Sequence, residues 1–209
     1  MPYAALLDFA AVFVFALTGD IAASRAQLDI VGFLFIAGLT AMGVGTVRDV
    51  ILDRSPIFWV ADQRYLAVAA AAGVLMFVAA GRFEKRYRIL LWLDAVALAV
   101  ALAAGILAAR AAGAPLGIVA IMGVVTGCLG GLMRDVVCNE VPLVLKQGEL
   151  YVTAAFAGAA LGAGAFALGL GPVPALLLAG AATFALRAGS LAFGWRLPGY
   201  GHRPPRIRG

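Results

Sequence analysis

The stretch GVGTVRDV, residues 43–50, places an Arg-Asp pair directly behind two glycines in a very apolar chain. A second stretch, GGLMRDVV at residues 130–137, repeats this arrangement 86 residues later. The same spacing separates other identical residues of less common types: Asp8 and Asp94, Thr40 and Thr126, Pro56 and Pro142, and Tyr65 and Tyr151. These matches indicate that the chain contains an internal duplication.

The composition is that of an integral membrane protein. Of the 209 residues, 64% are hydrophobic and only 13% are charged, whereas a soluble domain carries about 25% charged residues. A membrane-spanning helix needs roughly 20 mostly apolar residues, and the uncharged runs of this chain reach that length. We therefore predict an all-α fold with seven transmembrane helices, at about residues 3–24, 29–50, 63–81, 89–111, 115–137, 150–169 and 172–194.

Each copy of the duplication contains three of these helices. Because three is an odd number, the second copy enters the membrane upside down, and the repeats are inverted about an axis in the membrane plane. The seventh helix is an addition outside the repeat. The predicted division is a first repeat at 1–88, an inverted second repeat at 89–171, a seventh helix at 172–195 and a basic cytoplasmic tail at 196–209.

The positions of Lys and Arg predict the orientation in the membrane. Cytoplasmic loops are enriched in these residues, and both GRFEKRYR at 81–88 and the tail GHRPPRIRG at 201–209 are basic. With seven helices the two segments fall on one side, together with Arg25 and Lys146. We therefore expect a cytoplasmic C-terminus and an outer N-terminus. This asymmetry accounts for the net charge of +5, and nucleic-acid binding is not needed to explain it.

The duplicated charges are expected to form ion pairs near the two ends of a polar path. Antiparallel packing places Asp8 at the depth of Arg48, and the inversion places Asp94 at the depth of Arg134 on the other side. An unpaired charge within a membrane is costly, which favours these two pairs. In the alternative interpretation the Arg-Asp sequence only caps a helix end and meets lipid headgroups. The charged candidates are Asp8, Arg48, Asp49, Asp94, Arg134 and Asp135.

Small and hydroxylated residues precede the charges in both copies. Glycines weaken a helix and permit kinks, although they also serve close helix packing in membranes. The threonines lie about two turns deeper than the arginines, where a hydroxyl either lines a polar path or bonds a carbonyl of its own helix. The candidates along the path are Gly43, Gly45, Gly130, Gly131, Thr40 and Thr126.

Two further charges lie inside predicted helices without a counterpart in the other copy. Asp20 has Ile106 at the repeat position, and we expect it to pair with a nearby arginine such as Arg25. Arg187 in the last helix is expected to extend its side chain toward the cytoplasmic headgroups.

Enzymatic chemistry has little to build on in this sequence. We find no nucleophile–base pair, no metal-ligand spacing and no phosphate-binding loop, and the single histidine, His202, lies in the tail. Cys128 and Cys138 are interpreted as small apolar fillers or free thiols. We therefore predict no catalytic residues, no cofactor and no metal beyond transient permeating cations.

The glycine, Arg-Asp and proline pattern, present twice with a seventh helix behind it, resembles the prokaryotic family of trimeric intracellular cation channels, TRIC, which has also carried a glycine-transporter-like label. The resemblance covers roughly residues 5–195. It implies a homotrimer in the bacterial inner membrane, with a pore in each subunit lined by kinked second and fifth helices and passing potassium and also sodium. The basic lipid-binding motif of animal members has no clear match here.

Three classes of function are compatible with these observations. A passive cation channel agrees best with the resemblance. A secondary transporter for a small solute such as glycine is the alternative, because inverted repeats with interrupted helices are common in transporters. A structural or assembly protein without transport activity is the third. The expected partners are other copies of the chain, membrane lipid and the permeating K⁺ or Na⁺.

Overall fold

The computed structural model describes residues 2–79 and 86–198. Most of the basic segment at 81–88 and most of the tail at 196–209, with His202, lie outside the described residues. The helices are α1 (Pro2–Arg25), α2 (Ile30–Ile51), α3 (Phe58–Ala61), α4 (Arg64–Ala79), α5 (Arg86–Ala111), α6 (Leu116–Val137), η2 (Leu143–Leu145), α7 (Val152–Ala167) and α8 (Pro172–Phe193).

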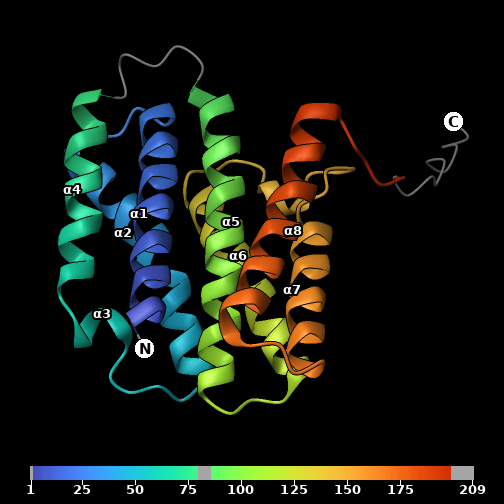
Figure 1. Ribbon diagram of the computed structural model, residues 1–209. Coiled ribbons are helices and arrows are strands. Elements are labelled where there is room, and N and C mark those ends of the chain that lie inside the picture. The colour runs from blue at the N-terminus through green and yellow to red at the C-terminus, as the bar shows by residue number, and fades with distance from the viewer. Residues whose placement is uncertain (1, 80–85, 199–209) are drawn as a thin grey trace, which may run out of the picture.

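The long helices form one bundle of antiparallel neighbours. Helix α5 lies in the middle, between α1, α2 and α4 on one side and α7 and α8 on the other (Figure 1). It packs against α1, α6 and α8, while α1 packs against α2 and α4. Since the chain alternates direction, the start of α1 and the end of α2 share one face, and the start of α5 and the end of α6 share the opposite face.

Local sequence accounts for where several helices begin and end. Asp29 precedes α2, and its carboxylate accepts a hydrogen bond of 2.8 Å from the backbone N–H of Gly32, which is typical N-capping. Helix α8 begins at Pro172, whose fixed φ suits the first turn. It stops at Gly194, which adopts a left-handed φ of 69°.

The duplication is visible in the geometry of the connections. Short helical segments, α3 and η2, follow α2 and α6. Asp53 and Asn139 occupy equivalent positions and both adopt a left-handed backbone, with φ of 50° and 55°. In both copies the next residue donates its N–H over 2.8 Å to the carbonyl of the aspartate in the Arg-Asp pair, from Arg54 to Asp49 and from Glu140 to Asp135.

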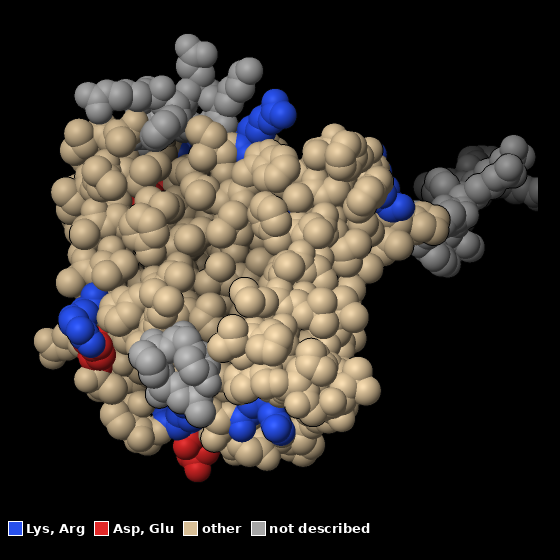
Figure 2. All heavy atoms as spheres, in the orientation of Figure 1, with Lys and Arg blue, Asp and Glu red and all other residues tan. Residues whose placement is uncertain are grey.

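The predicted all-α membrane fold is confirmed, with all seven predicted helices present and two short segments added. Five helices, α1, α2, α5, α6 and α8, are long and apolar enough to cross a membrane. Helices α4 and α7 have 16 described residues each. Figure 2 shows a continuous band of uncharged atoms between charged side chains near the upper margin and others in the lower part, as a membrane-embedded surface requires.

Glycines bring paired helices into close contact at equivalent positions of the two copies. A methyl group on Gly19 of α1 would lie 2.8 Å from the carbonyl oxygen of Ile36 in α2. A methyl group on Gly105 of α5 would lie 2.5 Å from the carbonyl oxygen of Met122 in α6. The backbones approach this closely because no Cβ intervenes.

Candidate functional site

Arg48 forms the centre of a charged cluster at the end of α2. Its Nε donates to Asp49 Oδ1 over 2.8 Å, and its Nη1 donates to Asp8 Oδ1 of α1 over 2.6 Å. The second oxygen of Asp49 accepts the backbone N–H of Phe58, at 2.9 Å, which fixes the start of α3. The Arg48 side chain is 2% exposed, so this is an ion pair within the protein rather than at a lipid headgroup.

The second copy builds the same cluster at the other face. Arg134 Nε donates to Asp135 Oδ1 over 2.8 Å, and Nη1 donates to Asp94 Oδ1 of α5 over 2.9 Å. Asp135 Oδ2 accepts the backbone N–H of Leu143 in η2 over 2.8 Å. Both predicted interhelical pairs are therefore confirmed. The aspartate of each Arg-Asp pair also accepts the N–H at the start of the short segment that follows, so neither pair only caps the end of its own helix at the lipid headgroups.

The two clusters differ in their surroundings. Asp8 keeps 16% of its side chain exposed, whereas the side chains of Asp94 and Arg134 are 0% exposed. A narrow cavity runs inward from the Asp8–Arg48 pair and leaves room for about one water molecule. Its lining comprises Asp8, Ala11, Val12 and Phe15 of α1, Ala41, Val44, Gly45 and Arg48 of α2, Phe58 of α3, Ala101 and Ala104 of α5, and Thr126 of α6.

Aromatic rings narrow this cavity. The Phe58 ring lies against Gly45 and 5.4 Å from the Arg48 guanidinium carbon. Phe15 is 0% exposed, and a methyl group on Gly130 of α6 would lie 2.9 Å from its ring. Glycine at 45 and 130 therefore makes the room that each phenyl ring occupies.

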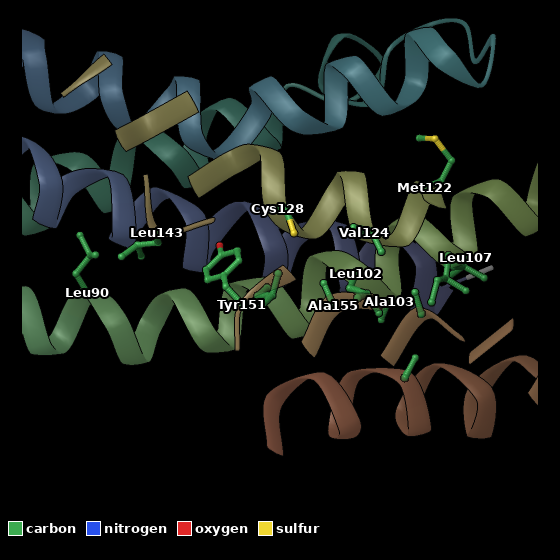
Figure 3. Packing of buried hydrophobic residues seen from close by; sticks show 14 of the residues in the cluster. Leu90, Leu102, Ala103, Leu107, Met122, Val124, Cys128, Leu143, Tyr151 and Ala155 are labelled. Atoms are coloured by element: carbon green, nitrogen blue, oxygen red, sulfur yellow. The ribbon is translucent and has the colours of Figure 1, made fainter. Parts of the chain in front are cut away.

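The second cluster is covered by side chains of the 143–151 segment. Figure 3 shows Leu143 and Tyr151 in the packed interior near Leu90 of α5 and Cys128 of α6. A methyl group on Gly131 would lie 3.1 Å from both the Tyr151 hydroxyl and Asp94 Oδ1. The tyrosine hydroxyl thus reaches the ion pair and, with Leu143, closes this end.

The two threonines behave differently although their positions are equivalent. Thr40 donates its hydroxyl to the carbonyl of Ile36 in its own helix, over 2.7 Å. Thr126 lines the cavity, and its buried oxygen has no hydrogen-bond partner among the described residues. Of the two interpretations, back-bonding applies to Thr40, and Thr126 is the threonine placed on the cavity.

The predicted kink glycines lie within unbroken helices. Helix α2 runs through Gly43 and Gly45, and α6 runs through Gly130 and Gly131. Gly43 faces Met133 of α6, whose sulfur would lie 2.9 Å from an added methyl group. Close packing is therefore observed at all four glycines, and bending at these sites stays a prediction.

Further charged side chains lie at the same end of the bundle as the Asp8–Arg48 pair. Arg54 donates to Asp49 Oδ1 over 3.0 Å, so this carboxylate serves two arginines. Asp62 and Arg64 form an exposed pair at 2.6 Å. Hydrogen bonds from the Arg64 side chain and backbone lower the pKa of the Asp62 carboxyl, which keeps it charged at neutral pH.

The expected partner of Asp20 is wrong. Arg25 pairs with Glu140 at 3.0 Å and stacks over the Tyr87 ring at 4.6 Å. Tyr87 also accepts a hydrogen bond from Lys146. Arg25 lies beyond the end of the apolar run, where it reaches a partly exposed carboxylate, while Asp20 is 0% exposed and neither of its carboxylate oxygens has a hydrogen-bond partner among the described residues.

The expected position of Arg187 is also wrong. Its side chain does not extend to the headgroups but is 0% exposed and paired with Glu149 Oε2 at 2.7 Å. Its guanidinium carbon lies 5.0 Å from the centre of the Tyr151 ring. The reason is tertiary, since the packing of α7 on α8 brings the 148–151 segment to α8, and no local sequence signal reports that contact.

Three residues of the site were not among those predicted from the sequence: Phe15, Phe58 and Tyr151. The Tyr65/Tyr151 match was a usable signal, because a tyrosine kept at equivalent positions marks a shared structural place. The two phenylalanines had no such signal. Among the described residues, no group of three or more His, Cys, Asp or Glu side chains is placed to hold a metal ion.

The structure is that of a helical membrane protein made of two copies of one unit, each with a charged cluster around an arginine. A family model described as "Glycine transporter" matches residues 5–81 and again residues 91–167, which are the two repeats. A "UPF0126 membrane protein" of Vibrio cholerae is 36% identical over 194 residues, covering 92% of this chain and 81% of that protein. The "UPF0126 inner membrane protein YadS" of Escherichia coli K12 is 38% identical over 161 residues, covering 77% of each.

The chain also matches solved structures of channel proteins. The TRIC trimeric intracellular cation channel orthologue from Rhodobacter sphaeroides superposes with a TM-score of 0.89 at 39% identity, over 93% of this chain and 100% of that one. A structure described as the basis for conductance through TRIC cation channels gives a TM-score of 0.84 at 28% identity, over 95% and 98%. The chain belongs to the prokaryotic TRIC channel family, a family of cation channels and not of enzymes.

Proposed function

We propose that this chain is a channel subunit for monovalent cations, potassium and also sodium, with a pore inside each subunit. The supporting observation is the narrow cavity that begins at the Asp8–Arg48 pair and is lined by α1, α2, α5 and α6. In this proposal α2 and α6 carry the principal lining, through Gly45 and Thr126.

Neutralised arginines make such a path compatible with cations. A bare guanidinium at a pore mouth repels cations, but Arg48 and Arg134 each bind two carboxylates. The second cluster carries one more acidic than basic group, counting Asp94, Asp135 and Arg134. Local charge at this mouth therefore favours a cation.

In this proposal, the structure represents the closed state of the ion path. Phe15 and Phe58 narrow the first half, and Leu143 and Tyr151 cover the second cluster. Apolar constrictions stop ions by excluding water. Opening then requires movement of these rings, and bending of α2 and α6 at Gly43, Gly45, Gly130 and Gly131 supplies it.

The assembly and location follow from the relatives. We propose a homotrimer in the bacterial inner membrane, because a solved relative is a trimeric channel and another relative is called an inner membrane protein. The N-terminus lies outside and the C-terminus in the cytoplasm. Light scattering on purified protein should give a protein mass of three times 21.4 kDa, and a mass of one chain would contradict the trimer.

Recording in a planar bilayer tests the channel proposal. With unequal potassium chloride across the membrane, we expect discrete openings whose current reverses near the potassium equilibrium potential. Reversal near the chloride potential would contradict cation selectivity. Replacement of potassium by sodium on one side then measures the preference between the two ions.

A secondary transporter of a small solute such as glycine is the alternative, and the description of the matching family model favours it. A silent bilayer combined with gradient-driven glycine uptake into liposomes would support the transporter. The four helix glycines would then act as hinges for alternating access.

A further inference from the structure

Asp20 is a buried acid that the proposed conduction path does not use. Its residue exposure is 0%, and both carboxylate oxygens lack a hydrogen-bond partner among the described residues. It is not among the residues that line the narrow cavity. An ionised carboxylate without a partner is strongly disfavoured within a membrane, so this group needs a positive charge from elsewhere.

The side chain of Asp20 lies toward Gly73 of α4, at the place where α4 meets α2. A methyl group placed on Gly73 of α4 would lie 3.5 Å from Asp20 Oδ1 and 3.0 Å from the Leu34 side chain of α2. Phe9, about three turns earlier on the same face of α1, stacks on Tyr65 of α4 with ring centres 4.0 Å apart. Asp20 thus lies at the contact that holds α4 against the first two helices.

The second copy shows what this position requires for packing alone. Ile106 of α5 occupies the equivalent place, is 0% exposed and lies against Gly162 of α7. An apolar side chain therefore suffices to pack the third helix of a repeat. The acid at position 20 is an addition to that packing.

The charged and titratable groups on the helices around Asp20 are engaged elsewhere or exposed. On α2, Asp49 and Arg48 bind one another, and on α5 Asp94 binds Arg134. The other titratable groups on α1, α2, α4 and α5 whose side chains the structure describes also have partners or are exposed: Asp8 with Arg48, Arg25 with Glu140, Arg64 with Asp62, Tyr65 against Phe9 and Phe58, Tyr87 with Lys146, Arg110 over Phe166, and the exposed Arg88.

We propose that Asp20 is a proton-binding site whose neutral form holds α4 against α1 and α2. A proton needs a single carboxylate oxygen, whereas a hard metal cation takes several oxygen ligands. Within the described part of the chain, Asp20 belongs to no group of three or more His, Cys, Asp or Glu side chains that could hold a metal ion. Ionisation of Asp20 draws water into the contact and separates α4 from α1.

The separation of α4 from α1 affects the cavity through Tyr65 of α4. This ring contacts Phe9 at one side and Phe58 at the other, with centroid separations of 4.0 and 4.9 Å. Phe58 in turn occupies the cavity against Gly45. Loss of the proton therefore frees the ring that narrows the path, a consequence that rests on the proposed channel function.

Infrared spectroscopy of the full chain in lipid vesicles tests the proton site directly and needs no conduction. The wild-type protein should show a carbonyl band of a protonated carboxyl that disappears as the pH rises from about 5 to about 9. Asp20→Asn should lack this band, and Asp20→Leu, which copies the apolar side chain of the second repeat, should lack it too. Asp29→Asn removes an exposed carboxylate from the next helix start and should keep it.

A band that is unchanged in both Asp20 variants would overturn the proposal, as would its persistence throughout the pH range. Bilayer recording provides the second arm. Wild type and Asp29→Asn should open more often at alkaline than at acidic pH, and both Asp20 variants should lose this dependence. A proton band without any conduction would leave the site standing and contradict the channel function instead.

Discussion

Arg48 and Arg134 each hold two carboxylates in the same geometry, but only the first cluster reaches the cavity. The exposed fraction of the acid's side chain decides how much each interhelical pair matters for stability. Asp8 is 16% exposed, and Asp94 is 0% exposed. Removing one partner of a fully buried pair leaves an uncompensated charge, whereas a partly exposed charge is relieved by water.

Replacing Asp94 with Asn should therefore destabilise the protein more than replacing Asp8 with Asn. We expect a loss of about 3 kcal/mol for Asp94→Asn and about 1 kcal/mol for Asp8→Asn, with lower trimer yield in the first variant. Asp8→Asn should instead reduce cation conductance, because the charge of Arg48 at the mouth is less well balanced. Thermal unfolding in detergent and single-channel recording measure the two effects, and equal unfolding temperatures would contradict this difference.

Glycine at position 131 is required by the second cluster. A methyl group there would lie 3.1 Å from both Asp94 Oδ1 and the Tyr151 hydroxyl. We expect Gly131→Ala to cost about 1–3 kcal/mol through overpacking.

Gly117→Ala is the matched control for this substitution. It lies on the same helix, with no atom within 4 Å of an added methyl group, and should be neutral or stabilising by up to about 1 kcal/mol. Similar unfolding temperatures for the two variants would show that the space around Gly131 is not limiting.

At the scale of helices, α8 packs against both α7 and α5 of the second repeat. A methyl group on Gly158 of α7 would lie 2.6 Å from the carbonyl oxygen of Ala179 and would meet the Thr183 hydroxyl. Gly158→Ala should therefore loosen α8 and lower stability by about 1–3 kcal/mol.

Gly164→Ala on the same helix is the comparison, because no atom lies within 4 Å of the added methyl group. Limited proteolysis in detergent reports release of α8. We expect faster cleavage after α7 in Gly158→Ala only, and equal cleavage in both variants would contradict a tight α7–α8 contact.

The long helices were predictable from sequence because each is an apolar run of nearly constant composition. The short segments α3 and η2 were not, since they have four and three residues and are fixed by carboxylates of earlier helices. Asp49 holds the N–H of Phe58, and Asp135 holds that of Leu143. Contacts across the bundle, and not local propensity, create these segments. The proposed division at residues 88 and 171 stays a prediction.

The charged site was also predictable only in part. The interhelical pairs were predictable because duplication and antiparallel packing fix the relative depth of Asp8 and Arg48. The partner of Arg187 was not, because Glu149 lies 38 residues away and the two meet only through helix packing. Asp20 was assigned a neighbour in sequence, whereas the fold gives Arg25 a different acid, Glu140.

At the scale of the whole molecule, the two copies contain the same charged cluster but differ in how that cluster is covered. The first cluster opens onto a narrow cavity, and the second is sealed by Tyr151 and Leu143. Helix α8 contributes to this difference, since its Arg187 binds Glu149 and lies over the ring of Tyr151. The first repeat has no additional helix behind it among the described residues. We therefore expect conduction to depend on movements at both ends of the path.

The most direct test of the proposed path is cysteine modification at the cavity during recording. A cysteine replaces Ala41 of α2, which is 3% exposed and lines the cavity, in a protein whose two native cysteines are changed to alanine. A cysteine at Val74 of α4, exposed on the outside of the bundle, is the control. A charged thiol reagent should block the current of the Ala41→Cys channel and leave the Val74→Cys channel unchanged. Undiminished current through a fully modified Ala41→Cys channel would contradict the proposed path.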